Sequence, residues 1–166
     1  MEDISNILKN KAISKGLCDT WTKGWGKGHT LESLIAKYKS GLQWCMENKF
    51  PDIKFIDDNF GDLARIKNIY TKDKHTVYNS SISVCRGISE VEIYFNYYSL
   101  GSVWIGDNSN VNITVIDASI VTIHAFDSAS IHIENRRMDK SVKIYVDKNF
   151  TGTITNYGEI EIKYSK

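Results

Sequence analysis

The chain has 166 residues, a formal net charge of +1, 42% hydrophobic residues and 25% charged residues, which is typical of a folded protein and excludes wholesale disorder. Neither half of the chain is basic enough for charge alone to predict nucleic-acid binding. No stretch approaches the roughly 20 consecutive apolar residues that a membrane-spanning helix requires, so we expect no membrane partner.

The cysteines and the N-terminal segment both predict a cytoplasmic protein. Cys18, Cys45 and Cys85 are widely separated and lack the paired spacing of a disulfide framework or a metal site. The first residues are acidic where a signal peptide carries basic residues, and their apolar residues are spaced rather than continuous. We therefore expect a protein of a reducing compartment.

In the first part of the chain, the apolar residues follow a helical period. A short helix is expected from Asp3 to Lys15, ended by the glycine that follows. The strongest pattern predicts a helix between Thr30 and Asn48, with Thr30 as its N-cap. A further helix is expected to begin at Pro51 and to end at Gly61. We expect these helices to form an N-terminal domain over residues 1–74.

From about Val77 the period of the apolar residues changes to two, and the sequence becomes repetitive. Residues 107–134 read DNSNVNITVIDASIVTIHAFDSASIHIE, in which alternating Val and Ile residues are followed by an Asp or Asn at intervals of ten. Self-similarity at a short fixed period is typical of a solenoid, and the alternation indicates strands. The predicted fold class is α+β, with a small helical unit followed by a short β-solenoid over residues 75–166.

Two units of ten should make one turn of this solenoid, because ten residues are too few to enclose a filled interior. On this reckoning Asn112 lies beside His132 and Thr122 beside Lys143 in stacked strands, and three or four turns result. The corner aspartates are expected to accept hydrogen bonds from backbone amides. The helical unit should cover the first turn, and an irregular segment from Asn149 to Tyr157 with a final strand from Glu159 to Tyr164 should cover the last.

The repeated aspartates and the two histidines of the solenoid are candidates for metal-binding or catalytic groups. Calcium-binding solenoids use paired glycines that are missing here, so turn chemistry is the preferred interpretation of the aspartates. His124 and His132 are expected on different faces, where they cannot act together. No phosphate loop, nucleophile elbow, ligand set or triad can be assembled, so we predict no catalytic residue, no metal, no cofactor and no enzymatic activity.

The stretch WTKGWGKGHT, residues 21–30, interleaves aromatic and basic residues with glycines. Trp25, Lys23 and Lys27 could stack bases and meet phosphates from a flexible loop. The preferred alternative is that the tryptophans anchor this loop on the helical core, with the lysines in solvent. On the first interpretation, these three residues are candidates for partner binding.

A second aromatic concentration opens the solenoid, in the stretch VEIYFNYYSLGSVWI. The alternation sends some of its aromatic side chains inward and leaves others outside, where exposed aromatic residues mark recognition surfaces. The competing explanation is that they seal the junction between the helical unit and the solenoid. The candidate partner-binding residues here are Tyr94, Tyr97, Tyr98 and Trp104.

The layout resembles a loose group of small proteins of unassigned function from phages and mobile elements of the Bacteroidota. The resemblance is carried by the segments LCDTW, residues 17–21, and FPDIKFIDDNFGD, residues 50–62, followed by solenoid corners of the form D-x-[AS]-x-[VI] at Asp117 and Asp127. It covers most of the chain, but these motifs are structural and imply no active site. It implies a protein that a mobile element uses in the cytosol of its host.

Three functions are therefore expected, in this order. The first is a non-enzymatic binding protein that docks on a host protein or ribonucleoprotein and inhibits it, as an antagonist of host defence of the anti-CRISPR type does. The second is a structural accessory protein of a virion or other assembly that forms homo-oligomers. The third is an RNA- or single-stranded-DNA-binding protein that uses the Trp/Lys loop, whose binding should depend strongly on salt.

Overall fold

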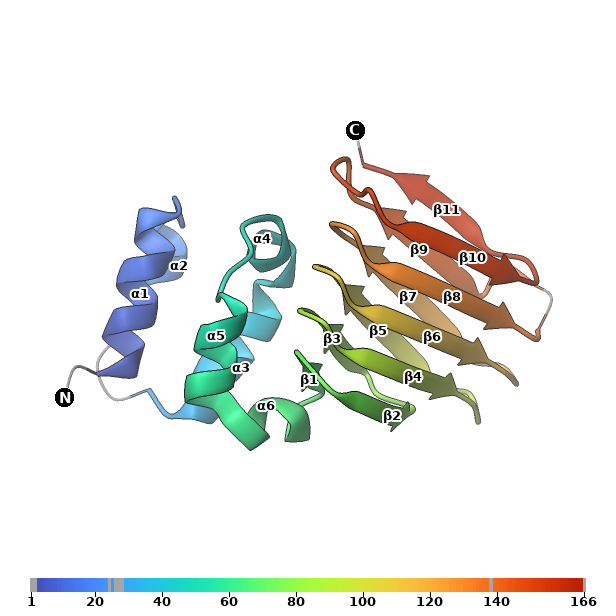
Figure 1. Cartoon of the computed structure of the whole chain (residues 1–166), viewed down its shortest axis with the longest axis horizontal. Coiled ribbons are helices and arrows are strands. Elements are labelled where there is room, and N and C mark those ends of the chain that lie inside the picture. The colour runs from blue at the N-terminus through green and yellow to red at the C-terminus, as the bar shows by residue number, and fades with distance from the viewer. Residues whose placement is uncertain (1–2, 24, 26–28, 138, 166) are drawn as a thin grey trace. The chain divides into compact units, whose positions relative to one another are not determined.

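A computed structural model describes residues 3–23, 25, 29–137 and 139–165 of the chain, which divides into two compact units, Met1–Lys67 and Asn68–Lys166. The first unit is helical, and the second is a β-solenoid of roughly four turns built from parallel strands (Figure 1). The predicted fold class, α+β with a short solenoid after a helical unit, is confirmed.

The helical unit is built from short segments whose ends are capped as their sequences predict. Asp3 and Thr30 precede the first and third helices, and their side chains accept hydrogen bonds from the amides of Ser5 and Ser33. These bonds satisfy amides that have no partner within the helix. The segments are α1 (Ile4–Ser14), α2 (Asp19–Lys23), α3 (Leu31–Ser40), α4 (Leu42–Glu47), α5 (Ile53–Phe55), the π-helical η1 (Ile56–Phe60) and α6 (Gly61–Ile66).

Two predicted helix boundaries in this unit are wrong. The helix expected from Thr30 to Asn48 is divided at Gly41, which ends α3 and precedes α4, because glycine is a weak helix former. The next helical segment begins after Asp52, whose carboxylate accepts a hydrogen bond of 2.8 Å from the Phe55 amide, and not at Pro51. The predicted end at Gly61 is confirmed, because Gly61 caps η1 with a left-handed φ of 49°, and α6 follows directly.

The solenoid consists of two parallel sheets whose strands alternate along the chain (Figure 1). One sheet has the order β1-β3-β5-β7-β9-β11 and the other the order β10-β8-β6-β4-β2. The strands are β1 (Ile69–Tyr70), β2 (Lys74–Tyr78), β3 (Ile82–Cys85), β4 (Glu90–Phe95), β5 (Leu100–Ile105), β6 (Asn110–Val115), β7 (Ile120–Ala125), β8 (Ser130–Asn135), β9 (Val142–Val146), β10 (Thr153–Tyr157) and β11 (Glu161–Tyr164).

The register of the central strands equals the predicted turn length of 20 residues. Glu90 lies beside Asn110, and Leu100 beside Ile120. The predicted neighbours Asn112 and His132 are paired, as are Thr122 and Lys143. A ten-residue repeat thus forms half a turn.

The interior is filled by the alternate residues of each strand. In β6 the exposed fractions of Val111, Ile113 and Val115 are 0%, 1% and 0%, and the residues between them point outward. Stacked turns place Val or Ile of one strand beside Val or Ile of the next, and burial of each such side chain stabilises the fold by roughly 1.5–3 kcal/mol. The stacked rows of inward Val and Ile residues therefore determine which residues lie on the outer faces.

The corner aspartates bond to backbone amides, as the sequence predicts; Asp147 bonds within its own corner, to the Asn149 amide, but three others bond between turns. Asp107, Asp117 and Asp127 all have left-handed backbone conformations, with φ of 55°, 53° and 57°. Their carboxylates accept hydrogen bonds of 3.0, 3.1 and 3.0 Å from the amides of Gly87, Tyr97 and Asp107, each 20 residues earlier. Each carboxylate therefore ties its own turn to the preceding one.

The predicted covering of the last turn is wrong. The segment expected to be irregular forms β10 over Thr153–Tyr157, whereas the expected final strand is present as β11, and the two pair in parallel with β8 and β9 and continue the coil. Within the described residues, each of these two strands has a neighbouring strand on one side only. Ile162 and Tyr164 occupy the register positions of buried Ile144 and Val146, yet their exposed fractions are 39% and 73%. The alternating side chains of these segments were sufficient for strand pairing. The segment that was expected to be irregular is therefore a strand.

We predict that Gly101→Val destabilises the solenoid. Gly101 pairs with buried Val121, but a Cβ atom at residue 101 would overlap the ring of Phe95. Overpacking of this kind costs about 1–3 kcal/mol, measurable as a lower midpoint of urea unfolding. The double variant Phe95→Val/Gly101→Val vacates that space and should recover part of the loss. Equal stability of Gly101→Val and wild type would contradict the prediction.

Candidate functional site

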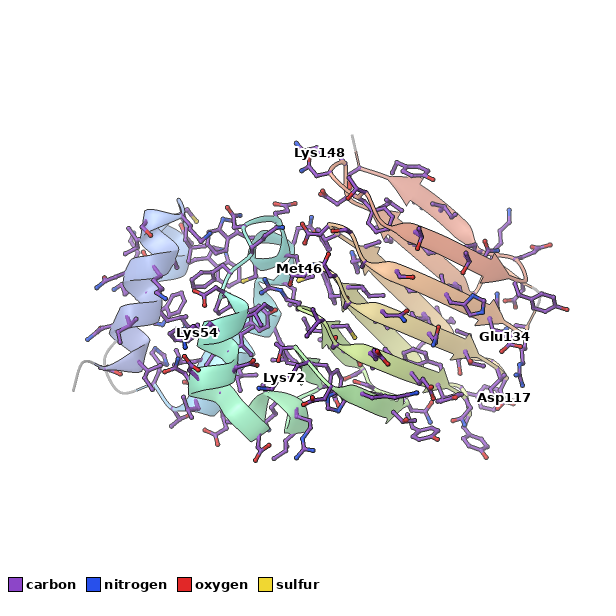
Figure 2. All side chains as sticks on the ribbon, viewed as in Figure 1. Met46, Lys54, Lys72, Asp117, Glu134 and Lys148 are labelled. Carbon is purple, nitrogen blue, oxygen red and sulfur yellow. The ribbon has the colours of Figure 1, made fainter. Side chains whose placement is uncertain are left out.

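The corner between β4 and β5 carries two exposed tyrosines in a strained backbone conformation. Tyr97 and Tyr98 have φ of 53° and 62°, and their exposed fractions are 79% and 78%. The equivalent left-handed position in the following turn is Asp117, labelled in Figure 2, whose carboxylate holds the Tyr97 amide. Left-handed backbone costs bulky residues about 1–2 kcal/mol each and is concentrated at functional sites. Packing of the solenoid therefore does not require the two exposed, left-handed tyrosines at this corner.

Further apolar side chains surround this corner on both sheets. Tyr78 and Tyr94 are paired on neighbouring strands, and their rings stack with centroids 5.2 Å apart and an interplanar angle of 18°. Leu100 and Ile120 are paired on the other sheet, with exposed fractions of 66% and 51%. We call the resulting surface the tyrosine patch: Tyr78, Tyr94, Tyr97, Tyr98, Leu100 and Ile120.

An acidic group borders the patch on the β4 side. The Tyr94 hydroxyl donates a hydrogen bond of 3.4 Å to the Glu92 carboxylate. The negative charge of Glu92 raises the pKa of Tyr94, so the phenol stays protonated and available as a donor. A surface of stacked rings with polar tips is the type of surface that protein interfaces use as anchors.

Trp104, the fourth aromatic residue predicted for this site, lies elsewhere on the solenoid. It stands on the outer face of β5, four residues after Leu100, and so about 13 Å further along the strand at roughly 3.3 Å per residue. Its ring stacks on His124 with centroids 3.7 Å apart, and His124 stacks on Tyr145 at 5.4 Å. The structure thus groups Trp104 with a separate aromatic ladder across β5, β7 and β9.

His124 is a neutral member of that ladder. Burial lowers the pKa of His124 to about 4, so its imidazole is uncharged at neutral pH. His132 lies on β8, in the other sheet, where its Nδ1 is 2.8 Å from the Thr155 hydroxyl oxygen. The predicted separation of the two histidines on different faces is confirmed, and they do not form a joint catalytic or metal-binding pair.

The predicted residues of the Trp/Lys loop belong to the helical unit. Lys23 is exposed at the end of α2, whereas Trp25 is buried with an exposed fraction of 7%. The Trp25 carbonyl accepts a hydrogen bond of 3.1 Å from Lys9 Nζ. Lys27 lies outside the described residues. Trp25 therefore anchors this part of the chain, as the preferred interpretation expects, while Trp21 remains 45% exposed.

Three members of the tyrosine patch were not predicted from the sequence. Tyr78 precedes the regular repeat, because β2 and β4 are offset by 16 residues rather than 20. The sequence did contain a signal for Leu100 and Ile120, because both are apolar residues in outward positions, one turn apart. Outward apolar residues that repeat at the turn length would have identified them.

The described residues hold little that could perform chemistry. They contain no group of three or more His, Cys, Asp or Glu side chains placed to hold a metal ion. Burial raises the pKa of the Cys85 thiol, which keeps it protonated and unreactive. Among the helices of the described ranges, none is both long and apolar enough to cross a membrane.

The fold and the patch together define a two-sided β-solenoid that presents an exposed aromatic corner. No protein-family model matches the chain, and searches of curated proteins and of solved structures find no significant match. The properties of the surface itself are therefore the basis for a functional proposal.

We predict that His124 makes the stability of the protein depend on pH. The pKa of His124 is about 4 in the folded protein, whereas that of an unfolded chain is about 6.5. As pH falls through this window the unfolded state binds the proton first, so the free energy of unfolding decreases. His124→Phe keeps a flat ring in the stack and should lose less stability over this window than wild type does.

Urea unfolding at about pH 7 and about pH 4.5 measures this difference. His132→Phe is the matched control, because His132 is exposed. An equal loss of stability in wild type and His124→Phe would show that His124 does not contribute.

Proposed function

We propose that this protein is a non-enzymatic binding protein of phage or mobile-element origin that docks on a protein or ribonucleoprotein of its host and inhibits it. The proposed place of action is the cytosol of the host cell. The tyrosine patch is the proposed contact surface, with Tyr97 and Tyr98 at its centre.

The observation that carries this proposal is the pair of strained and exposed tyrosines. The other left-handed residues described in the solenoid are Asp, Asn or Gly, which adopt this conformation more readily than Tyr. Two left-handed Tyr residues at one corner therefore sacrifice stability and expose two large rings to water. A binding partner that buries these rings would explain both costs, because buried tyrosines are among the strongest anchors of protein interfaces.

The solenoid also suits such a role energetically. Tyr97 is fixed through its amide to Asp117, and Tyr94 is fixed by its stack on Tyr78. Side chains that are already ordered lose little entropy on binding, so more of the contact energy appears as affinity. Inhibition would follow from occupying a surface of the partner, which requires no active site.

We predict that Tyr97→Asn/Tyr98→Asn abolishes partner capture without destabilising the protein. Asn tolerates left-handed backbone, so the thermal midpoint of the double variant should equal or exceed that of wild type. The measurement is a tagged pull-down from lysate of a Bacteroidota host, with and without nuclease, in which wild type should retain one stoichiometric host protein.

Tyr157→Asn is the control for this experiment, since Tyr157 is 60% exposed on β10 and lies outside the patch. Undiminished capture by the folded double variant would remove the patch from the proposal. Loss of wild-type capture after nuclease treatment would favour the nucleic-acid alternative instead.

A second candidate function is self-association into an assembly, and the end of the solenoid supports it. β11 has the sequence EIKY, and its outward residues Glu161 and Lys163 carry opposite charges. If two copies pair their β11 strands antiparallel about Ile162, Glu161 of each copy lies opposite Lys163 of the other. Such a pairing would satisfy the edge amides and carbonyls and cover Ile162 and Tyr164.

For this second candidate we predict a charge-swap pattern. Glu161→Lys and Lys163→Glu each place like charges opposite one another across the two-fold axis, so each variant alone should be monomeric. A one-to-one mixture of the two should form a heterodimer, and the double swap should restore the homodimer. Size-exclusion chromatography with light scattering distinguishes these states. A monomeric wild type at the highest concentration tested would contradict self-association.

A further inference from the structure

We propose that the helical unit contains a binding site for a small planar aromatic carboxylate. The site is a pocket of about 390 Å³ within this unit, between α1, α2, α3 and α4. Its volume lies within the range of sites that bind small organic molecules. The site is independent of the tyrosine patch, which belongs to the solenoid.

The walls of the pocket are mainly aromatic. Trp21, Trp25, Tyr38, Trp44 and Phe50 all line it. Trp44 and Phe50 pack edge to face with ring centroids 5.4 Å apart, which holds this side of the pocket in shape. Flat rings on several sides favour a flat apolar body, because such a body can stack on one ring and meet the edges of others.

Two polar groups in these walls, a buried N–H donor and a cation, favour a ligand that accepts hydrogen bonds. Trp25 is buried, and among the residues that the structure describes its indole Nε1 has no hydrogen-bond partner. An indole N–H only donates, and burial without an acceptor is unfavourable. Lys37, also in the lining, places its Nζ 5.8 Å from the centroid of the Trp25 ring. A donor and a cation therefore lie at the same wall.

A carboxylate is the group that fits this wall. One oxygen can accept from the Trp25 indole while the negative charge meets the Lys37 ammonium, as a charge-assisted hydrogen bond. The acidic residue of the lining, Glu47, already accepts a hydrogen bond from Gln43 Nε2 at the far end of α4. The Lys37 cation over the Trp25 ring thus favours an anionic group at this wall.

Isothermal titration calorimetry with 2-naphthoate and its neutral isostere 2-naphthamide tests the proposal on the full chain. Wild type should bind 2-naphthoate saturably at one site, and more tightly than 2-naphthamide. Lys37→Met should weaken 2-naphthoate binding by about tenfold and remove the preference for the acid. Trp25→Phe, which keeps the ring but loses the N–H, should weaken 2-naphthoate binding as well, and Lys37→Arg should retain it.

Lys39→Met is the control, because Lys39 lies on the same helix but does not line the pocket. Circular dichroism establishes that each variant is folded before titration. Absence of saturable binding by wild type, equal binding of acid and amide, or unchanged binding by folded Lys37→Met would each overturn the proposal.

Discussion

The fold of the second unit depends on the parallel pairing of each strand with a strand of the next turn, which lies 20 residues later in the central turns. The sheet hydrogen bonds join neighbouring turns, and the inward Val and Ile residues of all turns form one common core, so a single turn cannot bury its apolar side chains alone. The corner carboxylates of Asp107, Asp117 and Asp127 strengthen the same relation, because each bonds to the amide one turn earlier. Stability therefore comes from repetition, and any residue that departs from the repeat needs a separate explanation.

The tyrosine patch is the clearest such departure. The Tyr97 amide still bonds to Asp117, but Tyr97 has no carboxylate where Asp117 of the following turn has one. The stacked pair Tyr78 and Tyr94 lies on one side of that corner and Leu100 on the other. The amide bond holds the backbone of Tyr97 and the stack holds the rings of Tyr78 and Tyr94, so part of the cost of ordering this surface has been met during folding. Rigidity of the coil and exposure of its rings together make this surface suited to binding.

The solenoid could be predicted from the sequence because the pattern that indicates it is local and repeated. The ten-residue spacing of Asp117 and Asp127, with alternating Val and Ile between them, determined turn length, register and corner chemistry. The break at Gly41 was not predicted because the helical period of the apolar residues continues through this glycine, although its weak helix propensity was visible in the sequence. The continuation of the coil beyond Asn149 was not predicted because it depends on how a short segment pairs with distant strands. The grouping of Trp104 with His124 and Tyr145, and the aromatic pocket of the helical unit, likewise result from packing between segments whose spacing carries no period.

The constant register also affects how this chain can change in evolution. β4, β6 and β8 align residue for residue, as do β3, β5 and β7. Duplication or deletion of a DNA segment that encodes exactly one turn would join matching corners and leave every remaining strand in register. A single-residue insertion inside a strand would instead turn its apolar side chains outward. The solenoid can therefore gain or lose length in whole turns, and with it the number of corners available for recognition.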